Sequence, residues 1–310
     1  MEKPDSQSDL KREDGTIVLT ITIPSVQVKE TFERIKKAAL KEVKVPGFRP
    51  GKAPSDLAEK QLNEEALSQS LFQELVPIAY ASAVTEKGIK PIISPQITIK
   101  SFKPPTRVGV PTEASGKDED LVIEAKTAER PPVNLGDYKS ELKRGFARFA
   151  VGEPSKKVLY GPEGKPLEGG EKVTAAAVLE KLRETSQVDV PHILIDFEVQ
   201  RMLSSLIDQV RGLGLTIDQY LSSQGKKAEE LRKEYHSIAQ RNLKDEFILS
   251  EISVKEGVKV SEKEIEEAIE AAPDEKTRAG LSEERGKNYL EDVLRKRKTI
   301  EHLIKLAGES

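Results

Sequence analysis

The chain has 310 residues, of which 36% are hydrophobic and 33% charged, with a formal net charge of −3 and no cysteine. This composition argues against a single compact globule and for several surface-rich modules, while so small a net charge favours no class of partner. The lack of cysteine excludes disulfides, thiol catalysis and cysteine-ligated zinc, and no run approaches the ~18 apolar residues of a membrane-spanning helix. We therefore expect a cytoplasmic protein with no membrane partner.

The N-terminal part begins with polar residues and then shows a strand followed by a helix. Residues 1–14 are polar and charged, which predicts a tail and not a secretory signal, because an apolar run is missing. Residues 17–23 alternate with period two, as a half-buried strand does. In residues 28–45 the apolar side chains recur at spacings of three and four, which predicts a helix. Pro46 ends this helix, because the residue before a proline disfavours helical backbone.

Two further helices and two further strands complete this part. A helix is predicted over residues 66–75, and Pro77 is interpreted as the first residue of the next helix, where its missing N–H costs little. Residues 96–102 and 121–127 have the composition of strands. Residues 15–128 therefore form a small α+β domain with its helices inserted between strands.

The second half is helical after an irregular stretch. Prolines and glycines crowd residues 129–172, which predicts a linker with a short hairpin around residues 157–167. From residue 173 to 310 the periodicity is helical, and short turns join the helices into antiparallel arms. Ser261 and Glu264 have the spacing of a capping box. The predicted helices cover residues 191–211, 216–221, 227–255, 261–272 and 282–306.

A basic segment with a glycine-rich loop is the most informative feature. Between Arg34 and Lys52 there are seven cationic residues and one acid, a local net charge of +6 in a chain of net charge −3. Such a cluster suits an RNA-rich surface, because lysine and arginine displace condensed counterions from phosphates. In the loop, Phe48 beside Arg49 joins an apolar anchor to a charged fork. Charge alone favours a plainer interpretation, a solvated helix face followed by a turn.

The loop sequence GFRPGKAP, residues 47–54, resembles the G-F-R-x-G-x-x-P signature of the ribosome-binding domain of bacterial trigger factor. The flanking order of strand, helix, loop, helix and strand resembles the same domain. The segment ERPPVNLGDYK (129–139) resembles the exit from that domain. Three later segments resemble the chaperone domain of the family, namely VDVPHILIDFEVQRML (188–203), DQYLSSQGKKAEELR (218–232) and EGVKVSEKEIEEAI (256–269).

This resemblance implies an α+β fold with three parts: an N-terminal ribosome-binding domain, an extended linker, and an all-α chaperone domain whose helical arms cradle unfolded chain. It implies an ATP-independent chaperone that docks at the exit tunnel of the large ribosomal subunit, on a tunnel-exit protein and ribosomal RNA, and holds nascent polypeptides. The site residues follow from the same resemblance. Phe48, Arg49 and Pro50 would make the central contacts, Gly47 and Gly51 would shape the loop, and Lys44 and Lys52 would contact phosphates.

The chain departs from the family in one respect. Members usually carry an FKBP-like prolyl isomerase domain between linker and helical domain, and the interval of residues 144–172 is far too short for one. No other enzyme is indicated, because His192, His236 and His302 lie far apart and a glycine-rich phosphate loop is missing. We therefore expect no catalytic residue, no metal site and no cofactor.

Two alternatives stay open. One is an isomerase of the trigger factor type with a reduced catalytic domain, and the other is a ribosome assembly factor that holds ribosomal proteins. The sequence also leaves open whether the chain forms a weak homodimer away from the ribosome.

Overall fold

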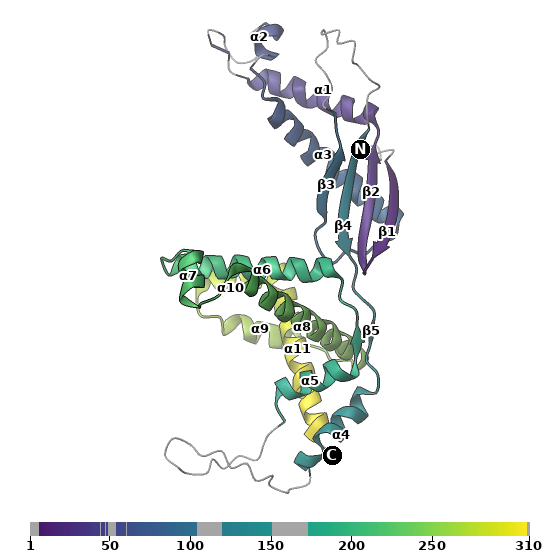
Figure 1. Cartoon of the computed structure of the whole chain (residues 1–310), viewed down its shortest axis with the longest axis vertical. Coiled ribbons are helices and arrows are strands. Elements are labelled where there is room, and N and C mark those ends of the chain that lie inside the picture. The colour runs from purple at the N-terminus through teal and green to yellow at the C-terminus, as the bar shows by residue number, and fades with distance from the viewer. Residues whose placement is uncertain are drawn as a thin grey trace. The chain divides into compact units, whose positions relative to one another are not determined.

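The computed structural model describes residues 6–43, 45–46, 48, 54–59, 61–103, 120–150 and 173–308, without the side chains of residues 55–56 and 147–150. The chain divides into two compact units (Figure 1). The N-terminal unit contains residues 1–130 together with residues 191–194, and the helical unit contains residues 131–190 and 195–310.

The N-terminal unit combines an antiparallel sheet with helices, as the sequence predicts. Among the described residues the sheet has four strands in the order β1-β2-β4-β3, so β1 and β3 are its edges. The elements are β1 (Gln7–Glu13), β2 (Thr16–Ile23), α1 (Ser25–Glu42), α2 (Ser55–Glu59), α3 (Glu64–Glu86), β3 (Gln96–Ser101) and β4 (Leu121–Ala128).

The core of this unit lies between one face of the sheet and helices α1 and α3. Successive side chains of a strand point to opposite faces, so alternate aliphatic residues of β2 all meet the helices. Helix α3 contributes apolar residues spaced by four, which share one helix face and pack on the sheet. The buried residues of this core include Ile17, Leu19, Ile21, Ile23, Val28, Phe32, Leu67, Leu71, Leu75, Ala79, Ala83, Leu121, Ile123 and Ala125.

Helix α3 continues through Pro77, so the prediction that Pro77 begins a new helix is wrong. A proline inside a helix removes one backbone hydrogen bond, and its ring crowds the preceding turn. Pro77 and Gln73, whose carbonyl would have accepted that bond, are both exposed, so water can satisfy the carbonyl. The buried residues on either side of Pro77 keep the two halves in one helix, because both halves pack on the same sheet face.

The predicted polar tail over residues 1–14 is wrong for Gln7–Glu13, which forms strand β1 and pairs with β2. Only Ser8 is buried in this strand, and Leu10 packs partly against the core. Polar and charged side chains are typical of an edge strand, because they discourage pairing with other chains. An edge strand of this kind therefore resembles a tail in sequence.

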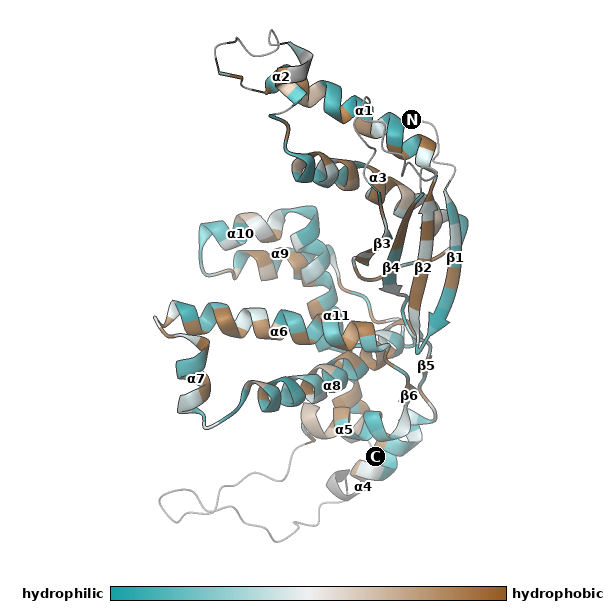
Figure 2. Ribbon diagram, turned by 45° about the horizontal axis from the view of Figure 1, so that its top comes forward, coloured by the Kyte–Doolittle hydropathy of each residue, from teal (hydrophilic) through white to brown (hydrophobic). Residues whose placement is uncertain are grey.

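The helical unit has a body and two projecting helical pairs. Figure 2 shows α9 and α10 as a pair that stands apart from α6 and α8. The body of the helical unit is formed by α4, α5 and parts of α8 and α11, whose apolar residues make one buried cluster. The elements are β5 (Val133–Asn134), α4 (Tyr138–Ala150), α5 (Ala175–Thr185), β6 (Gln187–Val188), α6 (His192–Gly212), α7 (Ile217–Ser223), α8 (Ala228–Lys255), α9 (Glu262–Glu270), α10 (Glu275–Ser282) and α11 (Glu284–Gly308).

The predicted linker over residues 129–172 is wrong for Tyr138–Ala150, which forms helix α4. Tyr138, Leu142 and Phe146 lie one turn apart and are all buried in the body of the helical unit. The nearby glycines and prolines hid this spacing of four. The hairpin predicted around residues 157–167 lies outside the described residues.

Replacing Pro77 with alanine should stabilise the N-terminal unit, because the substitution restores an N–H to a continuous helix. The expected gain is about 1–3 kcal/mol, since proline is about 3 kcal/mol worse than alanine in a helix interior but restricts the unfolded chain. Hydrogen–deuterium exchange of peptides from residues 64–86 should slow in the variant. Unchanged exchange would mean that Pro77 starts a separate helix. Ser70→Ala, at an exposed position of the same helix, is the control.

Candidate functional site

The predicted site begins where helix α1 ends. Val43 leaves the helical conformation, with ψ at 133°, and its N–H donates to the Ala39 carbonyl. Val45 is buried, and its carbonyl accepts a 3.0 Å hydrogen bond from the Phe48 N–H. This bond closes a four-residue turn with Pro46 at its second position, where the fixed φ of proline is favoured. Phe48 is 45% exposed, so a buried valine anchors the turn and a phenylalanine faces solvent.

Helix α2 holds the other end of the loop. The Pro54 carbonyl accepts hydrogen bonds from the N–H groups of Leu57 and Ala58, each at 3.1 Å, and so begins the helix. Ala58 is buried, whereas Leu57 is 43% exposed. Leu57 thus adds a second exposed apolar side chain close to the loop. Sequence reasoning missed it, because a single leucine in a short helix gives no sign of which way it faces.

Two ion pairs fix the helices that carry the loop. Lys36 of α1 pairs with Glu59 of α2 at 3.3 Å, and Arg34 of α1 pairs with Glu74 of α3. These pairs are at least partly exposed, so each contributes modestly to stability and chiefly orients the helices. Arg34 and Lys36 are therefore partly neutralised, and the local charge of +6 counted from sequence overstates what a partner would meet.

Two other cations of α1 are exposed to solvent. Lys37 and Lys41 are exposed, and among the described residues neither takes part in an ion pair. They lie four residues apart and so share one face of the helix that leads into the loop. Of the predicted site residues only Phe48 is described. Those outside the described residues are Lys44, Gly47, Arg49, Pro50, Gly51 and Lys52.

Several large apolar side chains of the helical unit are exposed and lie outside its buried clusters. Helices α6 and α8 bury Ile195, Val199 and Ala239 between them, and a second cluster joins α7 through Leu206, Val210 and Leu231. The other faces and the turns retain solvent-facing apolar residues. Exposed large hydrophobic residues of this unit are Phe197, Ile207, Leu213, Leu215, Val254, Tyr289 and Val293. Exposed apolar residues dispersed in this way suit weak contacts with unfolded chain.

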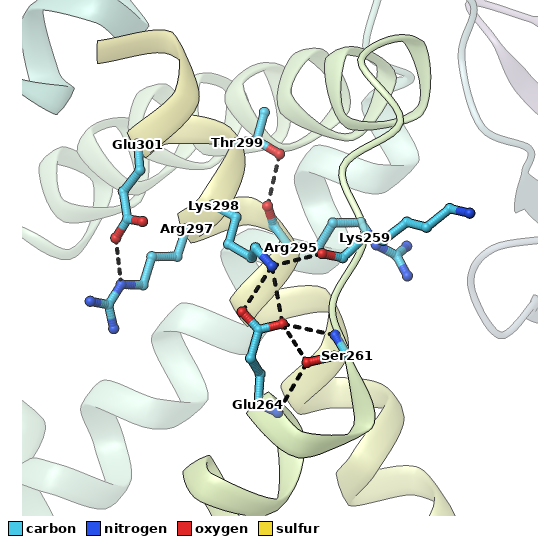
Figure 3. Close-up of polar contacts among 8 residues, drawn as sticks. All are labelled: Lys259, Ser261, Glu264, Arg295, Arg297, Lys298, Thr299 and Glu301. Carbon is cyan, nitrogen blue, oxygen red and sulfur yellow. Dashed lines mark hydrogen bonds and ion pairs between the residues drawn. The ribbon is translucent and has the colours of Figure 1, made fainter. Parts of the chain in front are cut away.

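A polar clamp fixes helix α9 to helix α11 (Figure 3). The Lys298 ammonium donates to both carboxylate oxygens of Glu264, at 2.8 and 3.0 Å, and to the Lys259 carbonyl at 2.8 Å. Glu264 also accepts from the N–H and the hydroxyl of Ser261, so the predicted capping box is confirmed. The Lys298 ammonium, followed by the Ser261 donors, lowers the pKa of Glu264 to about 2. The clamp thus sets where the α9–α10 projection leaves the body.

Two further polar contacts tie the body together. Glu256, which caps the C-terminus of α8, accepts from the Tyr138 hydroxyl at 2.5 Å and pairs with Lys139 at 2.8 Å. A carboxylate is unfavourable at the C-terminal end of a helix, which carries partial negative charge. The hydrogen bonds from Tyr138 and Lys139 offset this unfavourable interaction. The Lys139 and Tyr138 hydrogen bonds hold the pKa of Glu256 below its usual range. Arg183 of α5 donates hydrogen bonds of 2.8 and 2.7 Å to the two carboxylate oxygens of Asp245 of α8. Burial nevertheless raises the pKa of Asp245, because it outweighs the lowering effect of Arg183.

Within the described part of the chain, no group of three or more histidine, aspartate or glutamate residues is placed to hold a metal ion. Nor does any helix described there combine the length and apolar character needed to cross a bilayer.

Two family models match the chain. The model described as bacterial trigger factor protein (TF) matches residues 6–151, and the model described as the C-terminus of bacterial trigger factor protein matches residues 168–305. Together they span nearly the whole chain, and only residues 152–167 lie between them.

Curated relatives point to the same family. The trigger factor of Shouchella clausii (strain KSM-K16) is 25% identical over 436 aligned positions, covering 96% of this chain and 98% of the relative. That of Pelotomaculum thermopropionicum is 23% identical, with 95% of each chain covered. That of Macrococcus caseolyticus is 37% identical over 129 residues, which are 42% of this chain and 27% of the relative. The first alignment is longer than this chain, so that relative carries residues with no counterpart here.

One solved structure shares the fold. It was reported as "Promiscuous Substrate Recognition in Folding and Assembly Activities of the Trigger Factor Chaperone". It superposes with a TM-score of 0.58 at 15% identity, covering 96% of this chain and 99% of that chain.

The clamp around Glu264 predicts a specific dependence on pH. The pKa of Glu264 is lower in the folded chain, about 2, than its ordinary value of 4.5, so the stabilisation is complete above pH 4.5 and is lost as the pH falls toward 2. Urea unfolding of wild type and Glu264→Gln between pH 5 and pH 2 measures this contribution. The wild type should lose more stability than the variant over that interval.

A carboxyl titration by NMR supplies the control. In Lys298→Met, which keeps the length of the side chain without the ammonium, the pKa of Glu264 should rise toward its ordinary value. It should stop short of that value, because Ser261 still donates. An unchanged pKa in this variant would show that Lys298 does not form the clamp in solution.

Proposed function

Because the chain belongs to the bacterial trigger factor family of ribosome-associated chaperones, we propose that it docks at the ribosomal exit tunnel through the loop of residues 47–54. We propose also that it holds nascent polypeptides without ATP. The observation that carries the docking proposal is the exposed Phe48, projected from a turn that the buried Val45 anchors. By the family pattern Arg49 and Pro50 follow Phe48 as contacts, Gly47 and Gly51 shape the loop, and Lys44 and Lys52 reach phosphates.

The surroundings of the loop support an RNA-rich docking surface. Lys37 and Lys41 present two unpaired cations on the helix that leads into the loop, among the described residues. Ion pairs from α1 to α2 and from α1 to α3 hold the supporting helices in place. An interface built from one apolar anchor and a few lysines would be sensitive to salt and quick to release. A tunnel-exit protein and nearby ribosomal RNA are the partners we propose for it.

The helical unit supports the holding of clients. Its exposed apolar residues are scattered over α6, the α6–α7 turn, α8 and α11. Contacts of this kind are individually weak and need no particular client sequence, which suits diverse unfolded chains. We propose that the chain acts in the cytoplasm without a cofactor, and that any homodimer away from the ribosome is weak.

We propose further that this chain is not a prolyl isomerase. The two family models leave only residues 152–167 between them, and the Shouchella clausii relative has residues with no counterpart here. Helices α4 and α5, which flank this interval, pack side by side in the body, with Lys181 of α5 only 3.7 Å from Glu141 of α4. Because α4 and α5 pack in the same core, a domain can be present or absent in the interval between them without rebuilding that core.

The docking proposal is tested by co-sedimentation with large ribosomal subunits at several salt concentrations. Wild type should pellet with the subunits, and the triple variant Phe48→Ala, Arg49→Ala, Pro50→Ala should lose most of this binding. The triple variant removes the anchor and the charged fork together, and hot-spot residues of this kind carry most of an interface's binding energy. If the triple variant binds as well as wild type, the loop is not the dock.

A second variant separates charge from the anchor. Lys37→Gln with Lys41→Gln should weaken binding and lower the slope of log affinity against log salt by about two, one for each phosphate that a lysine no longer neutralises. Lys11→Gln, on the edge strand β1, changes the net charge without touching the α1 face and should leave the slope unchanged.

A proline-limited refolding assay tests the isomerase proposal. We expect no acceleration above the uncatalysed rate, because that rate is set by rotation about the X–Pro bond and the chain has no room for the family's catalytic domain. The full-length Shouchella clausii relative, used at equal concentration, is the comparison. Acceleration by this chain would revive the alternative of a reduced catalytic domain.

A further inference from the structure

The two edges of the N-terminal sheet differ in character. Strand β1 is an edge with exposed charges at Asp9, Lys11 and Glu13. Strand β3 is the other edge, and among the described residues no strand pairs with its outer side (Figure 1). Its residues from Gln96 to Lys100 are all exposed. Proteins usually protect such an edge with charges, as β1 does, because its unpaired N–H and C=O groups can bind another strand.

The face of β3 that continues the core is apolar and uncovered. Ile97 pairs with Ala125 and Ile99 with Ile123, so these four residues share the helix-covered face of the sheet. Ala125 and Ile123 have no exposure, whereas Ile97 is 37% and Ile99 43% exposed. The helices therefore cover β4 and stop short of β3.

Further apolar groups lie at the two ends of this edge. Ile92, 47% exposed, donates its N–H to the Ala128 carbonyl at 2.9 Å and so lies beside the end of β4. At the other end, Phe102 packs edge-to-face on Phe72 of α3, with ring centroids 4.8 Å apart. Regular pairing with β4 ends at an irregularity after Ile99. The usable edge is therefore short, from Gln96 to Ile99.

We propose that the outer edge of β3 binds an extended segment of a client polypeptide, which adds to the sheet as a fifth strand. The inference rests on the proposed function, because it names a client-binding surface on the N-terminal unit. Backbone groups of the client would pair with the open edge, and its alternate apolar side chains would cover Ile97 and Ile99. Backbone pairing requires no particular client sequence beyond this alternation.

The charges beside the edge favour a client segment over a second copy of this chain. On the polar face, Lys100 and Lys126 both pair with Glu124, at 3.1 and 3.8 Å, which leaves one net positive charge. A second copy would bring the same lysines to the same edge and add repulsion. A segment whose polar positions are neutral or acidic would instead complement this face.

The test measures binding of a labelled, capped peptide of about nine residues, a typical strand length, in which valine alternates with threonine and glutamate. Fluorescence anisotropy with the full chain gives the dissociation constant. Ile99→Lys, which places a charge on the apolar face, should raise this constant about tenfold, because an inward-pointing charge blocks strand addition. Thr98→Lys adds the same charge at the neighbouring position on the polar face and should not weaken binding. The amides of residues 96–99 should exchange more slowly with peptide bound.

Several outcomes would overturn the proposal. Ile99→Lys and Thr98→Lys could bind the peptide alike, or a peptide of the same composition with valines at helical spacing could bind equally well. Amides of residues 96–99 that are already fully protected in the free chain would show that the chain covers its own edge. Sedimentation showing a dimer that Ile99→Lys dissociates would assign the edge to a second copy.

Ribosome binding and suppression of client aggregation are measured on the same variants. Wild type and Ile99→Lys could hold a denatured client equally well while the peptide binds both with the same affinity. In that case this inference fails and the chaperone function stands. If wild type neither binds ribosomes nor holds clients, the proposed function itself fails.

Discussion

Four aliphatic side chains of strand β2, from Ile17 to Ile23, have no exposure to solvent, and their burial under helix α3 organises the N-terminal unit. Because these residues occupy alternate positions, they all face one side of the sheet, and α1 and α3 must lie on that side. Helix α3 is kept on the sheet strongly enough to run through Pro77. With both long helices fixed in this way, the C-terminal end of α1 and the Val45 carbonyl that accepts from the Phe48 N–H have a firm support.

The helical unit depends in a similar way on helix α11. This helix contributes Leu303 and Ala307 to the body and extends to the projection formed by α9 and α10. In a chain that is one-third charged, polar contacts supplement these cores at the places where elements join. Lys298 and Glu264 connect α11 to α9, and Glu256 connects α8 to α4. Large apolar side chains such as Phe197 and Tyr289 lie outside these cores and stay exposed.

The sequence alone predicted the elements whose apolar period is strong. The alternation in β2 and the capping box of α9 were visible, and the structure confirms them. The period of α1 also predicted a helix correctly, but the helix covers Ser25–Glu42 and not residues 28–45, so it ends before Pro46 can stop it. Edge strand β1 and helix α4 escaped prediction for physical reasons. An edge strand buries too little to show an alternation, and the spacing of Tyr138, Leu142 and Phe146 was hidden among helix-breaking residues. The family signature in the loop was also readable, because a short motif is defined by residue identity and needs no packing.

The sequence by itself therefore determined the family, the two kinds of unit and the identity of the loop residues. Only the tertiary structure decided which charges are available and which apolar residues are exposed. Arg34 and Lys36 look as basic as Lys37 in the sequence, but acids from α3 and α2 reach the first two. Ile97 and Ile123 look alike as strand residues, yet one is exposed and the other has no exposure, because the helices stop short of β3. Burial and pairing depend on neighbours from distant parts of the chain, and local sequence carries no record of them.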